Sequence, residues 1–138
     1  MTDTLIVRPD MDIDADVIDI ILRYPPLVSD RHHIQVKVND GVVSFIGHTS
    51  NPINRGYLVD RVMALPGVVD VNAEALYDDV NISLATGQVL PTGVIANTYY
   101  GTVVLSGKAP ADVDTVAMRV AQVPGVVRVV TTFGEAVL

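Results

Sequence analysis

Hydrophobic positions in the first half of the chain follow first a helical and then an alternating spacing. Apolar residues three and four positions apart predict a helix over 12–24. Strict alternation predicts a strand over 34–38. The triplet Asn39-Asp40-Gly41 favours the positive φ angles of a tight hairpin, so we expect a returning strand over 42–46 that ends at Gly47.

A second helix and a third strand complete this first set of elements. Ser50-Asn51-Pro52 is typical of a helix start, and Pro66-Gly67 is typical of a helix end. The apolar stretch over 68–76 predicts a strand, and a short edge strand is expected over 5–7, ahead of the first helix. The order of the main elements is therefore α-β-β-α-β.

The second half of the chain repeats this order with a weaker beginning. Residues 80–90 predict a short or broken first helix, because Gly87 interrupts their apolar spacing. The remaining expected elements are strands over 94–98 and 102–106, a helix over 110–123 and a strand over 126–133.

Two sequence motifs mark the repeat. The turn and strand at 38–47 return at 98–107, and Leu-Pro-Gly-Val-Val at 65–69 returns as Val-Pro-Gly-Val-Val at 123–127. We interpret the shared positions as structural. They are Gly41, Gly47, Pro66, Gly67, Gly101, Gly107, Pro124 and Gly125.

The repeat predicts an α+β fold of two tandem α-β-β-α-β units, each a small mixed sheet with two helices packed on one face. We place the first domain, with a leader, at 1–77 and the second at 78–138. The junction Tyr77-Asp78-Asp79 is too short for a flexible linker, so the two copies are expected to pack on each other. A unit of roughly 60 to 75 residues is only marginally stable by itself, so packing of the two copies should stabilise both.

Composition and charge limit the classes of function. Apolar residues make up 49% of the chain and aromatic residues 5%, so a folded protein with an aliphatic core is expected. The net charge of −7 repels nucleic-acid phosphates, so no nucleic-acid binding is expected. The absence of cysteine excludes disulfides and thiolate metal sites. Without a signal-peptide pattern we expect a cytoplasmic protein, or a periplasmic one if a leader was removed.

An acidic cluster opens the first predicted helix. Asp10, Asp12 and Asp14 have the spacing of the start of a calcium loop, but Ala15 and Ile21 stand where that loop needs glycine and glutamate. We interpret the acids as a helix N-terminus, where the helix dipole favours negative charge.

Three histidines are the other metal-binding candidates. His32 and His33 are neighbours in a segment expected to be extended, so their side chains point to opposite faces and cannot chelate one ion. One of them could meet His48 across the sheet, together with Asp30, but surface histidines are the better interpretation. Because no catalytic motif is present either, we predict no catalytic residue, no metal, no cofactor and no enzymatic activity.

The second turn differs from the first in a way that the fold does not require. Tyr99 and Tyr100 replace Asn39 and Asp40, although tyrosine is poorly suited to a solvated turn with positive φ. One or both rings could pack over the other copy or cap the sheet. The functional alternative is an amphipathic tip that contacts a membrane or a partner, since tyrosine has one apolar and one polar end.

The repeated pattern resembles the BON domain family, small bacterial α/β modules often found in tandem. The first copy carries Ile-x-Val-x-Val-x-x-Gly-x-Val-x-Phe-x-Gly at 34–47 and Pro-Gly-Val-x-x-Val at 66–71. The second copy carries Gly-x-Val-x-Leu-x-Gly at 101–107 and Pro-Gly-Val-x-x-Val at 124–129. Together the two copies cover nearly the whole chain.

The resemblance implies the α-β-β-α-β fold and a non-catalytic role, and family members are associated with osmotic and envelope stress and proposed to bind phospholipid membranes. We therefore expect a tandem module for binding or stress protection at a membrane surface, with Tyr99 and Tyr100 as candidate contacts. The alternative is a protein-interaction or assembly module that uses an exposed sheet edge. A small-ligand site between the copies has only the acidic surplus in its favour.

Overall fold

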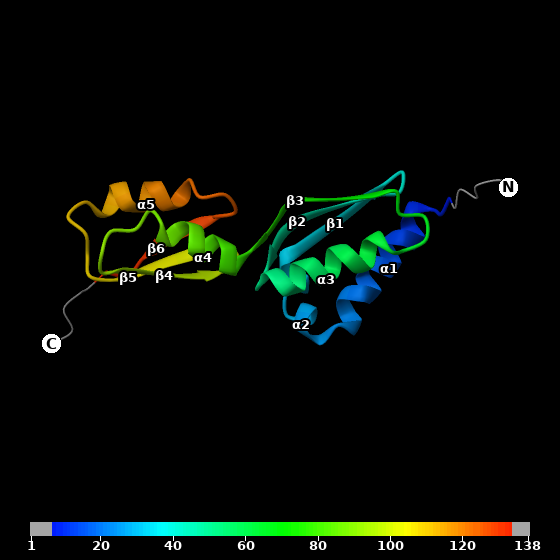
Figure 1. Ribbon diagram of the computed structural model, residues 1–138, viewed down its shortest axis with the longest axis horizontal. Helices are drawn as coiled ribbons and strands as arrows, with labels where there is room; N and C mark the ends of the chain where they lie inside the picture. Colours follow the sequence, from blue (N-terminus) through cyan, green and yellow to red (C-terminus); the bar gives the residue numbers. More distant parts are fainter. Residues whose placement is uncertain (1–6, 134–138) are drawn as a thin grey trace.

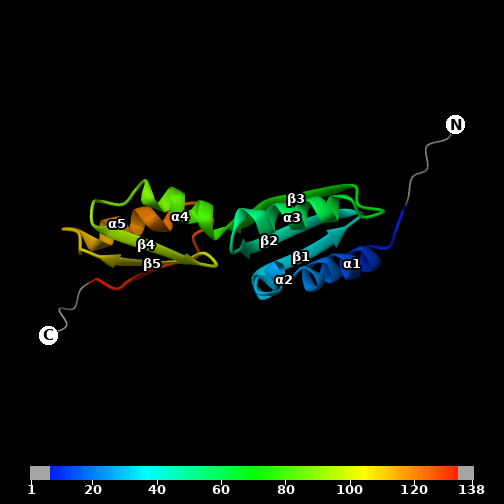
Figure 2. The ribbon, with the colours of Figure 1, turned by 60° about the horizontal axis from the view of Figure 1, so that its bottom comes forward.

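Two α/β units lie end to end along the long axis of the computed structural model, which describes residues 7–133 (Figure 1, Figure 2). The elements of the first unit are α1 (Asp10–Arg23), α2 (Pro25–Val28), the 3-10 turn η1 (Arg31–His33), β1 (Ile34–Asn39), β2 (Val42–Thr49), α3 (Pro52–Met63) and β3 (Asp70–Asp78). Those of the second are α4 (Asp79–Gly87), β4 (Val94–Tyr99), β5 (Thr102–Gly107), α5 (Val113–Ala121) and β6 (Arg128–Thr131).

Each unit contains one three-stranded mixed sheet. The orders are β1-β2-β3 and β4-β5-β6, and in both sheets the first pair is antiparallel and the second is parallel. The hairpins β1–β2 and β4–β5 share the same register, with Ile34 opposite Gly47 and Val94 opposite Gly107. The predicted α+β fold of two tandem units is confirmed.

Each sheet packs its own helices against one face. In the first unit Val43 and Phe45 of β2 lie in a buried cluster with Leu58 of α3. In the second unit Val103 and Leu105 of β5 occupy the same positions, and their cluster includes Ile82, Val116 and Val120 from the two helices. Fully burying such a side chain contributes about 1.5–3 kcal/mol, so each unit has a core of its own.

The opposite face of each sheet is not covered by a helix. In Figure 1 the helices of the first unit lie below their sheet, whereas α5 lies above the sheet of the second unit. The two open faces are therefore turned to different sides of the molecule.

Several predicted element ends are wrong, and Gly47 is the most informative. This glycine does not end β2, which continues to Thr49. Its φ is +135°, and a Cβ there would collide with the carbonyl group of His33. Gly47 is therefore required by the close approach of two backbones rather than by the end of a strand.

The weakly predicted helix over 80–90 is unbroken and occupies α4. Asp78 starts it, because its carboxylate accepts a hydrogen bond from the backbone N–H of Asn81 at 2.8 Å. Gly87 is its last residue, so the glycine ends the helix instead of interrupting it. The strand expected over 5–7 lies outside the described residues except for Val7, which is in no strand.

Candidate interaction surfaces

Both hairpins close with the same two-residue turn. In the first turn Asp40 and Gly41 have φ angles of 50° and 79°, and in the second Tyr100 and Gly101 have 48° and 82°. Tyr99 is the last residue of β4 and lies outside the turn. Of the two candidate tyrosines, Tyr100 alone adopts the left-handed conformation, which is unusual for a bulky side chain.

An aspartate at the start of the preceding helix stabilises each turn. The carboxylate of Asp10 accepts hydrogen bonds from the backbone N–H groups of Asp40 and Gly41, at 2.9 and 3.0 Å. The carboxylate of Asp79 accepts from the N–H groups of Tyr100 and Gly101, at 2.6 and 3.1 Å. The helix dipole was the predicted reason for Asp10, and its contact with the turn was not predicted, although an aspartate begins the first helix of both copies.

Tyr100 joins the second unit to the first. Its hydroxyl donates a hydrogen bond to Oδ1 of Asp30 at 2.9 Å, and its ring stacks on His33 with the centroids 3.6 Å apart. Asp30 is completely buried, and its Oδ2 accepts from the backbone N–H of Ser50 and from Nδ2 of Asn54. Burial, followed by the hydrogen bond to Asp30, raises the pKa of Tyr100 to about 12.

His48 provides the second contact between the units. Its Nε2 lies 2.6 Å from the carbonyl oxygen of Gly125, at hydrogen-bonding distance. The backbone of Gly101 lies so close that a Cβ there would collide with the His48 imidazole. Tyr77 completes the contact, with its ring 6.0 Å from that of His48 and directly against Gly125.

His33 and His48 therefore hold the two units together. The expectation that His32 and His33 lie in an extended segment is wrong, because they belong to the 3-10 turn η1. His32 and His33 are exposed, as the preferred interpretation has it, and the alternative cluster of one of them with His48 and Asp30 is replaced by separate contacts of His33 and His48 with the second unit. Within residues 7–133 no group of three or more histidine, aspartate or glutamate side chains could hold a metal ion.

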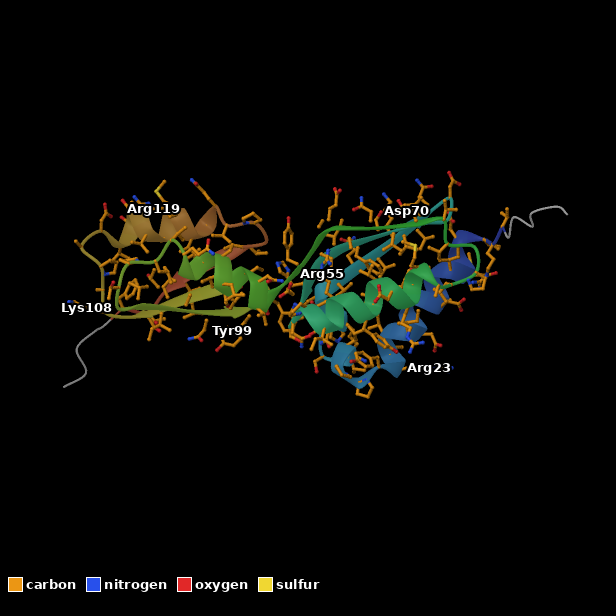
Figure 3. The ribbon with its side chains drawn as sticks, in the orientation of Figure 1. Arg23, Arg55, Asp70, Tyr99, Lys108 and Arg119 are labelled. Carbon is orange, nitrogen blue, oxygen red and sulfur yellow. The ribbon has the colours of Figure 1, made fainter. Side chains whose placement is uncertain are left out.

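Tyr99 lies on the open face of the second sheet, where its side chain is 62% exposed. Figure 3 shows it on the side of the sheet away from α5. The alternation along the strands places Ile95, Val104 and Val130 on the same face, and Ile95 is 56% exposed. The equivalent positions of the first unit are Gln35, Asn39, Ser44 and Asn72. The open face of the second sheet is thus the more apolar of the two, although it also carries Asn97, Thr102 and Ser106, and the first open face carries the exposed Ile46.

The repeat positions shared by the two copies lie mostly at turns. Gly41, Gly67, Gly101, Gly107 and Gly125 all have positive φ, as Gly47 does. Pro66 and Pro124 precede the glycines that follow α3 and α5. These positions shape the backbone of the two units and carry no reactive group.

The geometry defines a tandem pair of small α/β modules that contact each other. The family model of the BON domain matches residues 9–79, just over half of the 138 residues, so the chain belongs to the BON domain family. A search of curated proteins gave no match. No helix among the described residues is long and apolar enough to cross a membrane.

Two solved structures similar to this chain come from a structural protein of the type III secretion system of Chlamydia trachomatis, CdsD. The C-terminal domain of CdsD is 15% identical, with a TM-score of 0.37 over 91% of this chain and 98% of that one. A second CdsD structure is 16% identical, with a TM-score of 0.35 over 90% of this chain and 94% of that one.

Proposed function

We propose that this BON-domain protein is a non-catalytic binding module that associates with phospholipid membrane surfaces through the open face of its second sheet. The observation that carries the proposal is the contrast between the two open faces. Ile95, Tyr99, Val104 and Val130 stand where the first unit has glutamine, asparagine and serine side chains. The family to which the chain belongs is known for binding membranes or mediating interactions.

The charge distribution favours an apolar contact over an electrostatic one. The net charge of −7 opposes general attraction to anionic lipid. Among the outward-facing residues of β4, β5 and β6, the one charged side chain is Arg128, which lies opposite Thr102. A face with an exposed isoleucine, half-buried valines, a tyrosine and an arginine suits the interface between headgroups and acyl chains.

Of the two tyrosines, Tyr99 is the membrane contact in this proposal. Tyr100 contacts Asp30 and His33 of the same chain, which matches the packing alternative considered for this turn. The location of the protein, cytoplasmic or periplasmic, remains a prediction, and so do its role in osmotic or envelope stress and the domain boundary between 77 and 78.

A single introduced tryptophan tests this proposal, because the chain contains none. Tyr99→Trp should shift its fluorescence to the blue on addition of phosphatidylcholine vesicles and be quenched by brominated acyl chains. Asn39→Trp, at the equivalent position of the first unit, is the matched control and should remain in water. Equal responses of the two variants, or no response from either, would overturn the proposal.

A protein partner is the alternative outcome. In the first unit the edge strand β3 is protected, because Arg55 donates to the carbonyl oxygens of Leu76 and Ala73 at 2.7 and 2.8 Å (Figure 3). In the second unit the edge strand β4 carries Ile95 and Tyr99. If the fluorescence of Tyr99→Trp does not respond to vesicles, the open face and the β4 edge become the surfaces on which to look for a protein partner.

A further inference from the structure

The contact between the two units has two unlike sides. On one side is the tip of the second unit, formed by its hairpin turn and by the loop at Gly125. On the other side is the end of the first unit, formed by His33 and His48. Each unit has a tip, which is its hairpin turn, and an end, which is the opposite extremity of its sheet. The tip of the first unit and the end of the second are not used in this contact and lie at the two extremities of the molecule (Figure 1).

The tip of the first unit has the same backbone as the docked tip and a different side chain. Asp40 replaces Tyr100 at the turn and is exposed. Gly67, with a φ of +85°, replaces Gly125 with its φ of +91°. A pocket of about 430 Å³ lies here, lined among others by Asp10, Asp40, Gly67 and Val69.

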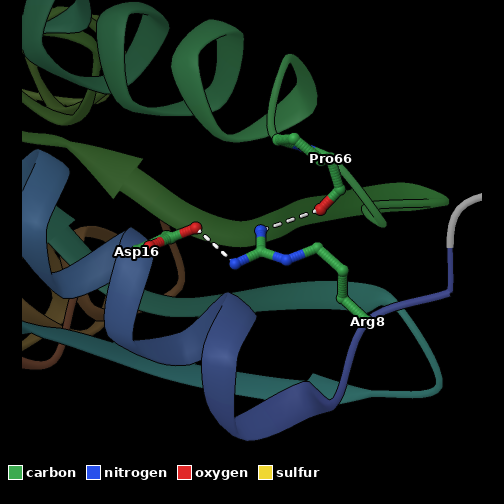
Figure 4. A network of polar contacts seen from close by, with 3 residues as sticks. All are labelled: Arg8, Asp16 and Pro66. Carbon is green, nitrogen blue, oxygen red and sulfur yellow. Dashed lines mark hydrogen bonds and ion pairs between the residues drawn. The ribbon is translucent and has the colours of Figure 1, made fainter.

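Arg8 holds this tip in shape from within the same unit. Its guanidinium donates to the carbonyl oxygen of Pro66 at 3.0 Å and pairs with Asp16 at 2.8 Å (Figure 4). Its aliphatic stem lies against Gly67, as the ring of Tyr77 lies against Gly125 in the second unit. The Gly67 loop is therefore as well supported as the loop that receives His48.

The end of the second unit carries the complementary change. Lys108 follows Gly107 as His48 follows Gly47, and it is exposed. Gly93 takes the place of His33, and its carbonyl oxygen accepts a hydrogen bond from the backbone N–H of Lys108 at 2.9 Å. Figure 3 shows Lys108 at one extremity of the molecule and Asp70, which begins β3 beside the first turn, near the other.

The residues that differ between the inner contact and the two outer surfaces therefore complement each other in charge. His48 faces the Gly125 carbonyl and the backbone of Gly101, in the turn of Tyr100, inside the molecule. At the outer surfaces the equivalent residues are Lys108 on one side, and Asp40 with the Gly67 carbonyl on the other. A lysine can donate to that carbonyl and pair with the carboxylate.

We propose that copies of this chain associate head to tail, with the first-unit tip of one copy seated on the second-unit end of the next. Lys108 of one copy lies between Asp40 and the Gly67 carbonyl of its neighbour. A contact between two different surfaces repeats in one direction and produces open chains or closed rings. The outer contact has no counterpart of the ring stacking on His33 or of the bond to Asp30, so it is weaker than the inner one and depends on concentration.

Sedimentation velocity of the full chain over a range of concentrations tests this association. The average mass of the wild type should rise with concentration at low salt and fall when salt screens the Lys108–Asp40 pair. Lys108→Glu and Asp40→Lys should each weaken the association at least about tenfold, because each places like charges opposite one another. Arg23→Glu, a charge reversal on an exposed side chain at the C-terminal end of α1, is the matched control and should leave the association unchanged.

Mixing the Lys108→Glu and Asp40→Lys variants makes the test specific. The lysine introduced at position 40 of one variant can face the glutamate introduced at position 108 of the other. The unchanged Asp40 and Lys108 of the two variants can also face each other, so an equimolar mixture should recover the mass that each variant lost alone. A wild type that stays monomeric at every concentration would overturn the proposal. So would an association that survives Lys108→Glu, or a mixture that fails to recover.

Discussion

The hydroxyl of Tyr100 donates a hydrogen bond to the buried carboxylate of Asp30, 2.9 Å away and in the other unit of the molecule. Tyr100 holds a φ of 48° to make this bond. Such conformations persist where the surrounding contacts determine them, and here the Asp79 carboxylate and the His33 ring do so. The turn of the second hairpin is thus part of the contact that fixes the two units end to end.

Tyr100→Phe should lower the free energy of unfolding by about 1–3 kcal/mol, because Oδ1 of the buried Asp30 loses its hydrogen-bond donor. Urea unfolding followed by circular dichroism measures this loss. Tyr99→Phe is the control and should change stability by less than about 0.5 kcal/mol, since its side chain is exposed. Equal urea midpoints of unfolding for the two variants would show that the hydrogen bond to Asp30 does not stabilise the fold.

Alkaline pH should lower the free energy of unfolding through the ionisation of Tyr100. The pKa of Tyr100 is raised from 10.0 to about 12, so above pH 10 the unfolded chain releases this proton before the folded chain does. The contribution of Tyr100 is therefore fully present below pH 10 and is lost as the pH rises toward about 12. An ultraviolet titration of tyrosinate should contain one late step that Tyr100→Phe removes. A late step that persists in this variant would assign it to another tyrosine.

Gly101→Ala should destabilise the protein by about 1–3 kcal/mol or more, because residue 101 has a φ of +82° and a new Cβ would collide with His48. Gly56→Ala is the matched control. Gly56 lies within α3 and a Cβ there meets nothing within 4 Å, so alanine should stabilise by about 0.4–1 kcal/mol. Thermal unfolding of both variants measures the two opposite shifts, and a stabilising Gly101→Ala would contradict the described contact.

Asp79→Ala should cost more stability than Asp10→Ala, although both remove the acceptor of two turn N–H groups. Asp79 is 8% exposed, and the hydrogen bond that it accepts from the N–H of Gly101 is buried. Alanine would leave this N–H without an acceptor and out of reach of water, which should lower the free energy of unfolding by about 1–3 kcal/mol. The turn at Asp40 is more exposed, and water can replace the lost carboxylate there. Chemical denaturation of the two variants compares them, and an equal or reversed order would contradict this ranking.

The sequence predicted the repeated architecture because its signals are local. Alternation in β1, the turn at Asp40-Gly41 and the cap of Asn51 on α3 each depend on neighbouring residues. Asn51 starts α3 as predicted, and its side chain accepts from the backbone N–H of Asn54 at 2.8 Å. The ends of elements were less predictable, since β2 passes through Gly47 for a reason that lies in the carbonyl of His33.

The contact between the units could not be predicted from the sequence, because it joins residues far apart in the chain. Asp30 has no local feature that marks it as buried, and its donors come from Ser50, Asn54 and Tyr100. The unusual tyrosine in the second turn was the one visible signal. It indicated a special contact without showing whether that contact lay inside the molecule or outside it.

The apolar open face of the second sheet was also hidden. Ile95 and Val104 look like ordinary strand residues in the sequence. Two helices on one face of the sheet were predicted, but which strand residues point away from them follows from the buried positions of Val103 and Leu105.

The most direct test of the proposed membrane contact is co-sedimentation with phosphatidylcholine and phosphatidylglycerol vesicles at low and high salt. The wild type should bind both vesicles, and high salt should not release it because the contact is apolar. Ile95→Ser/Tyr99→Ser should lose this binding. Ile46→Ser, which removes a comparably exposed residue (52%) from the first open face, should bind like the wild type. A wild type that remains in the supernatant with both vesicles, or a double variant that still sediments with them, would contradict the account.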